Sequence, residues 1–184
     1  MATDFAKLRQ NEFWEKKMDR AVRVRDTNKS GDISRADFEL VVEHYRNLGT
    51  SNPTHIEVLS KYMLNLIETL HLTDESTTLS YDEFKEKFLR LVEEWTKNGT
   101  YKMFFGAMFS NLDVNGDGYI SLEEWTAHYN SMGIDPGYAR ASFEAMDVNG
   151  DGKISKEGFV NYHYEYYFTT ENKLNSSVLY GPLE

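Results

Sequence analysis

One segment constrains the fold of this chain more than any other. Residues 113–124 read Asp-Val-Asn-Gly-Asp-Gly-Tyr-Ile-Ser-Leu-Glu-Glu, with oxygen-bearing groups at positions 1, 3, 5, 7, 9 and 12. A calcium ion takes roughly six to eight oxygen ligands, and a loop with this spacing supplies them from between two helices. The predicted ligands are Asp113, Asn115, Asp117, the Tyr119 carbonyl, Ser121 and the bidentate carboxylate of Glu124. Gly118 at position 6 suits the sharp turn, which needs a positive φ.

The residues before this loop predict a helix. Phe105, Met108, Phe109 and Leu112 recur at i, i+3, i+4 and i+7, which is one face of a helix. A helix, a twelve-residue ligand loop and a second helix together make an EF-hand. Ile120, at position 8, suits a short strand that pairs with a second loop of the same kind.

The pattern recurs along the chain, which indicates internal repeats. Residues 147–155 and 26–34 repeat it clearly, and residues 72–83 repeat it faintly. We therefore predict an all-α fold of four EF-hands in two pairs, packed into one compact globule with short β pairing between loops. The predicted N-terminal pair spans 1–98, with loop I at 26–37 and a degenerate loop II at 72–83. The predicted C-terminal pair spans 99–184, with loop III at 113–124, loop IV at 147–158 and a tail at 169–184 that packs back onto the body.

Loop I has a complete but weaker set of ligands than loop III. The predicted ligands are Asp26, Asn28, Ser30, the Asp32 carbonyl, Ser34 and Asp37. The aspartate at position 12 is one methylene shorter than a glutamate, which favours fewer contacts to the ion and tolerates Mg²⁺ better. Loop II has Leu72 at position 1 and Thr77 in place of the glycine, so we expect it to bind no metal and to serve as the pairing partner of loop I.

Loop IV lacks one ligand. Its predicted ligands are Asp147, Asn149, Asp151, the Lys153 carbonyl and Ser155, but position 12 is Gly158. Two interpretations follow from the missing carboxylate. Either the loop binds calcium weakly with water filling in, or it is only structural.

Composition excludes several classes of function. The net charge of −10 disfavours nucleic acid and anionic membranes as partners and suits a protein that binds cations. There is no cysteine, and the N-terminal residues contain no apolar signal segment, so we expect a cytoplasmic protein. No catalytic triad, phosphate loop or zinc spacing is evident, which argues against an enzyme.

The sequence resembles the invertebrate sarcoplasmic calcium-binding proteins over its whole length. The resemblance rests on the opening Phe13-Trp-Glu-Lys-Lys-Met18, on four EF-hands with a degenerate second one, and on the closing Tyr180-Gly-Pro-Leu183. Relatives of that family include calexcitin-like proteins and the luciferin-binding proteins and photoproteins that handle coelenterazine. The resemblance implies a compact globule that acts as a cytosolic buffer of Ca²⁺ and Mg²⁺. Gly158 departs from the family pattern.

Two other functions remain as alternatives to the buffer. A calcium sensor would expose a groove for a target helix, but the seven methionines are scattered and the aromatic-rich sequence favours a closed core. A binder of a small hydrophobic ligand such as coelenterazine is suggested by His163, which shares a helical stripe with Phe159, Tyr162 and Tyr166. Photoproteins carry Trp and Tyr four and five residues after a similarly placed histidine, where this chain has Tyr167 and Phe168, so that pattern is only partly met.

Overall fold

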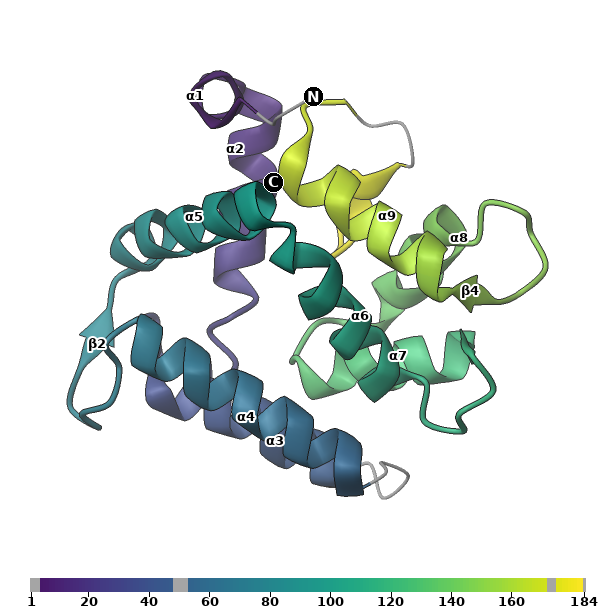
Figure 1. Cartoon of the computed structure of the whole chain (residues 1–184), viewed down its shortest axis with the longest axis horizontal. Coiled ribbons are helices and arrows are strands. Elements are labelled where there is room, and N and C mark those ends of the chain that lie inside the picture. Colours follow the sequence, from purple (N-terminus) through teal and green to yellow (C-terminus); the bar gives the residue numbers. More distant parts are fainter. Residues whose placement is uncertain (1–3, 48–52, 172–174, 184) are drawn as a thin grey trace.

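The computed structural model describes residues 4–47, 53–171 and 175–183 (Figure 1). Within them the helices are α1 (Phe5–Leu8), α2 (Glu12–Arg23), α3 (Arg35–Asn47), α4 (Pro53–Thr69), α5 (Tyr81–Asn98), α6 (Thr100–Leu112), α7 (Leu122–Ser131), α8 (Ala139–Met146) and α9 (Lys156–Phe168). Short 3₁₀ turns cover Pro136–Tyr138 and Ser176–Val178. The predicted all-α class is confirmed, and no helix in the described ranges is long and apolar enough to cross a membrane.

The ligand loops pair through short antiparallel strands, as predicted. Strand β1 (Ile33–Ser34) pairs with β2 (Thr78–Leu79), and β3 (Tyr119–Ile120) pairs with β4 (Ile154–Ser155). Ile120 lies opposite Ile154, and both side chains are buried. The residues at position 8 thus hold two loops together through one buried apolar contact and the backbone hydrogen bonds between the strands.

Local signals in the sequence explain where the helices begin and end. Ser80 and Ser121 each form a capping box with the glutamate three residues on, so α5 and α7 begin directly after their loops. Gly99 adopts φ 75°, which ends α5 and starts α6 in a new direction. The chain therefore turns at Gly99, between the two EF-hand pairs, where a residue with a side chain would be strained.

The two pairs share one core. Helix α4 packs against α6, α2 against α9, and α3 against α7, so each of these contacts joins the N-terminal half to the C-terminal half. Figure 1 shows α3 and α4 running side by side beneath α5 and α6. The largest completely buried side chains are mostly aromatic, among them Trp14, Trp125, Tyr129 and Tyr166. Such rings bury a large apolar area in few rotatable bonds, which explains the closed globule.

Helix α2 makes several polar contacts with residues near the end of the chain. Trp14 Nε1 donates to the Tyr167 carbonyl at 2.9 Å, and Lys17 Nζ donates to the Thr169 carbonyl at 3.0 Å. Arg20 Nε donates to the Tyr180 carbonyl at 2.8 Å. These bonds hold the end of α9, Thr169 and Tyr180 against α2; residues 172–174 and 184 of the predicted tail lie outside the described residues.

Candidate calcium-binding loops

The side chains at positions 1, 3 and 5 of loop III fold inward and shape the loop. Asp113 Oδ2 accepts from the Gly118 amide at 3.0 Å, and Gly118 has the expected positive φ of 86°. Asn115 Oδ1 accepts from the Asp117 amide at 2.8 Å, and Asp117 Oδ1 accepts from the Tyr119 amide at 2.9 Å. The other carboxylate oxygen, Asp113 Oδ1, is buried and has no hydrogen-bond partner among the described residues. Buried acceptors are normally satisfied, so this oxygen is free to bind a cation.

Glu124 reaches back across the same loop from position 12. Its Oε1 accepts from the Val114 amide at 2.9 Å and from the Asn115 amide at 3.3 Å. Its Oε2 accepts from the Ser121 amide and hydroxyl, both at 2.8 Å. The structure therefore places the two oxygens of the predicted bidentate ligand against loop positions 2, 3 and 9.

Loop I closes in the same way, although its last ligand is shorter. Asp37 Oδ1 accepts from the Asn28 amide at 3.1 Å, and Oδ2 accepts from the Ser34 amide at 2.8 Å. Asn28 Oδ1 accepts from the Ser30 amide, and the Ser30 hydroxyl donates to the Asp32 carbonyl at 3.0 Å. Aspartate thus spans this loop as glutamate does in loop III.

Asp26, at position 1 of loop I, is held by three donors. Its Oδ1 accepts from the Ser30 amide, and its Oδ2 accepts from the Gly31 amide, both at 2.9 Å. The Tyr81 hydroxyl donates to Oδ2 at 2.8 Å. Burial favours the protonated acid, but the bonds from Tyr81, Gly31 and Ser30 outweigh it and hold the pKa of Asp26 below its usual value. The charged form that a calcium ion needs is therefore the stable one.

Loop IV is shaped like loop III but stays open at position 12. Asp147 accepts from the Asp151 amide at 3.1 Å and from the Gly152 amide at 2.8 Å. Asn149 Nδ2 donates to Asp151 Oδ2, and Asp151 Oδ1 accepts from the Lys153 amide at 3.0 Å. The Gly158 amide donates to Ser155 Oγ at 3.1 Å, which is half of a capping box. The other half is missing because Gly158 has no carboxylate to accept from the Ser155 amide.

Loop II has lost the ligand pattern but keeps its place in the pair. Leu72 at position 1 is completely buried, and Glu83 at position 12 is used in the capping box with Ser80. Its Tyr81 contact with Asp26 was not anticipated from the sequence, since position 10 of an EF-hand loop contributes no ligand.

The donor set of loops I and III fits calcium. It is made of carboxylate, amide, hydroxyl and carbonyl oxygens, which are the ligands of a hard cation. Within the described ranges, no three acidic or histidine side chains gather closely enough to hold a metal by themselves. The acidic groups are turned onto loop amides instead, so calcium would replace hydrogen bonds such as those of Glu124.

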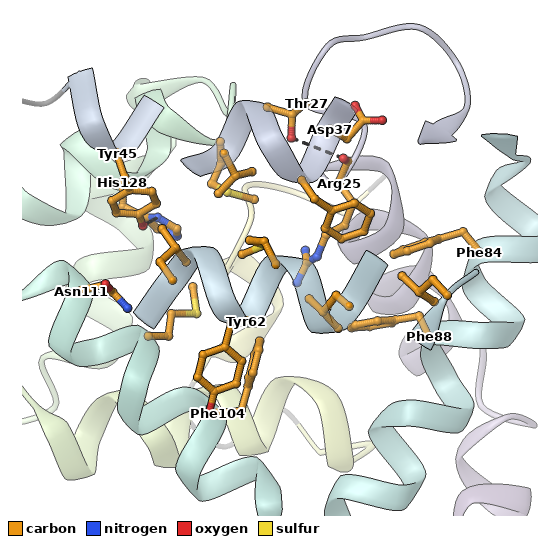
Figure 2. Close-up of a pocket in the computed structure, with 18 of the residues that line it drawn as sticks. Arg25, Thr27, Asp37, Tyr45, Tyr62, Phe84, Phe88, Phe104, Asn111 and His128 are labelled. Carbon is orange, nitrogen blue, oxygen red and sulfur yellow. Dashed lines mark hydrogen bonds between the residues drawn. The ribbon is translucent and has the colours of Figure 1, made fainter. Parts of the chain in front are cut away.

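A cavity of about 80 Å³ lies in the core between the pairs. Figure 2 shows Asn111 and His128 at one end of it and Phe84 and Phe88 at the other. Its wall is mostly apolar and includes Asp37, the position-12 residue of loop I. The cavity therefore reaches one of the predicted ligands of loop I.

His128 and His163 are buried and neutral. Burial lowers the pKa of His128 and of His163 to about 3. His163 packs against the Phe159 ring, with 4.1 Å between ring centroids, and its Nε2 is buried without a partner among the described residues. The cavity is lined by His128 and not by His163, which is a buried histidine of the core.

Comparisons with known proteins agree with this architecture. A family model for an EF-hand domain pair matches residues 103–164. The loops and the fold define an EF-hand calcium-binding protein. Sarcoplasmic calcium-binding proteins of Perinereis vancaurica tetradentata and Hediste diversicolor are each 33% identical over 181 residues, covering 94% of this chain and 99% of theirs. The chain belongs to the sarcoplasmic calcium-binding protein family, as the resemblance had indicated.

The fold is also that of a coelenterazine-binding protein. The calcium-loaded apo form of the coelenterazine-binding protein of Renilla muelleri superposes with a TM-score of 0.69. The match covers 93% of this chain and 96% of that one at 23% identity, so it shows a shared fold.

Proposed function

We propose that this protein is a calcium buffer that uses loops I and III, with Mg²⁺ able to occupy the same loops. The observation that carries the proposal is the oxygen Asp113 Oδ1, which belongs to position 1 of loop III and is buried without a hydrogen-bond partner among the described residues. The predicted ligands of loop I are arranged in the same way around Asp26 and Asp37. Loop IV, which lacks a carboxylate at Gly158, adds at most a weak site.

A closed core supports a buffer over a sensor. A sensor EF-hand opens on binding calcium and exposes a groove rich in methionine, whereas a buffer barely opens. Here rings such as Trp125 and Tyr129 are completely buried and bond to Ser142 at 2.6 and 2.7 Å. Moving α7 away from α9 would separate Trp125 from Phe159, whose ring centroids lie 6.1 Å apart, and expose both rings. We propose that the protein works in the cytoplasm, without enzymatic activity.

Calorimetric titration with calcium, with and without Mg²⁺, tests the buffer. We expect two principal sites, both weakened by Mg²⁺ through competition. Fluorescence of an apolar dye should change little on adding calcium. A large rise in dye fluorescence would identify a sensor, and fewer than two sites would contradict the assignment of loops I and III.

A second candidate function is the binding of a small apolar ligand in the core cavity. The cavity is about 80 Å³, and an enclosed apolar cavity of about 150 Å³ accommodates benzene. A multi-ring molecule such as coelenterazine would need the surrounding helices to move apart. Coelenterazine titration, followed by tryptophan fluorescence, tests this. Trp95 lies in the cavity wall, so quenching is expected if the ligand enters.

A further inference from the structure

Loop II carries no metal ligands, yet one of its residues contacts a ligand of loop I. Tyr81 is at position 10 of loop II, the first residue of α5. Its hydroxyl lies 2.8 Å from Asp26 Oδ2, across the pair of loops joined by β1 and β2. The Arg23 guanidinium lies over the Tyr81 ring at 5.0 Å from its centroid, which fixes the ring from the other side.

Comparison with the aspartates at position 1 of the other loops indicates the role of the oxygen that Tyr81 contacts. In loops I, III and IV, one carboxylate oxygen of the first aspartate accepts from the glycine amide at position 6. In loop III the other oxygen, Asp113 Oδ1, is left without a partner in the described chain. By this comparison, we assign Asp26 Oδ1 to the ion, although it also accepts from the Ser30 amide at 2.9 Å, because Asp26 Oδ2 is the oxygen that accepts from the position-6 glycine. Tyr81 donates to Oδ2 and so does not occupy the ligand position.

We infer that Tyr81 is a positioning residue for calcium at loop I, an inference that rests on the proposed calcium-binding function. Two donors on Oδ2, the Gly31 amide and the Tyr81 hydroxyl, restrain the rotation of the carboxylate and aim Oδ1 into the loop. Hydrogen-bonded partners of metal ligands act in this way, and their removal costs about 10- to 100-fold in affinity. No tyrosine stands at position 10 of loops I, III or IV, which hold Arg35, Leu122 and Lys156.

The degenerate loop II therefore has a role beyond strand pairing. Loop I has a shorter carboxylate at position 12 and fewer acidic ligands than loop III. A rigidly oriented Asp26 offsets part of that weakness. Loop II, which has no metal ligands, thus raises the calcium affinity of loop I.

The test is Tyr81→Phe, which keeps the ring and removes only the hydroxyl. The amides of Gly31, Gly118 and Gly152 each donate to the first aspartate of their own loop, so their NMR resonances report the three loops separately. Calcium is titrated in a chelator buffer, and the midpoint is read at each amide. We expect the Gly31 midpoint to rise about tenfold in Tyr81→Phe and the Gly118 midpoint to stay unchanged.

Tyr101→Phe is the matched control, because it also removes one hydroxyl from a half-buried tyrosine but lies in α6 of the C-terminal pair. It should move no midpoint. An unchanged Gly31 midpoint in Tyr81→Phe would overturn the inference, as would an equal shift at Gly118, which indicates a general loss of stability. If calcium moved neither Gly31 nor Gly118 in the unmodified protein, the proposed function itself would fail.

Discussion

The Tyr45 hydroxyl lies 2.5 Å from Nδ1 of His128, and this bond joins α3 of the N-terminal pair to α7 of the C-terminal pair. Both side chains are buried, and the His44 ring next to Tyr45 also contacts the Ser131 carbonyl of the other pair. The two halves are thus held together by directional polar contacts as well as by apolar packing. Such contacts fix one orientation of the halves, because a shifted interface would leave buried polar atoms without partners.

Tyr45→Phe should destabilise the protein by about 1–3 kcal/mol, because it leaves the buried His128 Nδ1 without its hydrogen-bond partner. The measurement is urea unfolding in chelator, with Tyr101→Phe as the control for loss of a hydroxyl away from this contact. Equal stability of Tyr45→Phe and the unmodified protein would show that the contact contributes nothing.

Stability without calcium should fall as the pH drops below neutral. An unfolded histidine has a pKa near 6.5, whereas burial lowers those of His128 and His163 to about 3. Between these two pKa values the unfolded state binds more protons than the folded state. Each histidine therefore lowers the free energy of unfolding by up to about 1.4 kcal/mol for each pH unit of decrease. The groups acting on His128 are His163, the Arg25 guanidinium, which disfavours its protonation further, and the Tyr45 hydroxyl.

The check is urea unfolding of metal-free protein at several values of pH between 7.5 and 5. His128→Asn keeps a polar atom near the Nδ1 position and should show a shallower dependence on pH. Because the acidic loops titrate in both proteins, the difference between them isolates the histidine. The same slope in both would contradict the prediction.

Glu124→Gln should remove the strongest calcium site. It deletes a charge and the bidentate contact at position 12 of loop III while leaving loops I and IV intact. Glu123→Gln makes the same change of charge at the neighbouring exposed position and serves as the control. Calorimetry should show one site fewer in the first variant and an unchanged number in the second. Unchanged stoichiometry and affinity in Glu124→Gln would show that loop III is not the principal site.

Gly158→Glu should strengthen or restore the fourth site. A Cβ at this position would lie 3.3 Å from Ser155 Oγ and 3.7 Å from the Met146 carbonyl, so a small adjustment admits the side chain. Glutamate would supply the missing ligand, complete a capping box with Ser155 and replace a poor helix former, at a gain of about 1 kcal/mol in helix propensity. Since Ile154 pairs with Ile120, loop III should bind more tightly as well.

Gly158→Gln is the control for this variant, since it has nearly the same size and helix propensity without the charge. A calcium titration of both variants separates ligand from helix effects. If neither an added site nor tighter binding is found in Gly158→Glu, another feature of loop IV limits it.

Calcium should raise the melting temperature markedly. A ligand that binds only the folded state stabilises it by RT ln(1 + [L]/Kd), about 4 kcal/mol at a thousandfold excess over Kd for one site. Scanning calorimetry in calcium and in chelator measures this directly. Superimposable curves would contradict a folded state linked to metal.

The fold and most of the loop geometry followed from the sequence because both depend on local spacing. The side chains at positions 1, 3, 5 and 12 of loop III accept hydrogen bonds from amides within the same twelve residues. Asp113 and Glu124 could therefore be placed without any tertiary information. The isoleucine at position 8 likewise predicted the strand pairs.

Contacts between distant segments could not be predicted in this way. Nothing near Tyr81 in the sequence indicates that its hydroxyl reaches Asp26, because the contact depends on how two loops pack. The core cavity depends on how five helices meet, so no local pattern in the sequence identified His128 as part of its wall. Local periodicity identifies the buried face of a helix, but it does not identify which partner that face meets.

The bonds from α2 to Tyr167, Thr169 and Tyr180 bear on how the protein folds during synthesis. Trp14 leaves the ribosome well before the carbonyl that it bonds, 153 residues later in the chain. At about 5–20 residues per second, that interval is roughly 8 to 30 seconds. During this time the nascent N-terminal pair lacks the part of α9 that bonds Trp14 in the folded protein, so the contact between α2 and α9 forms only at the end of synthesis.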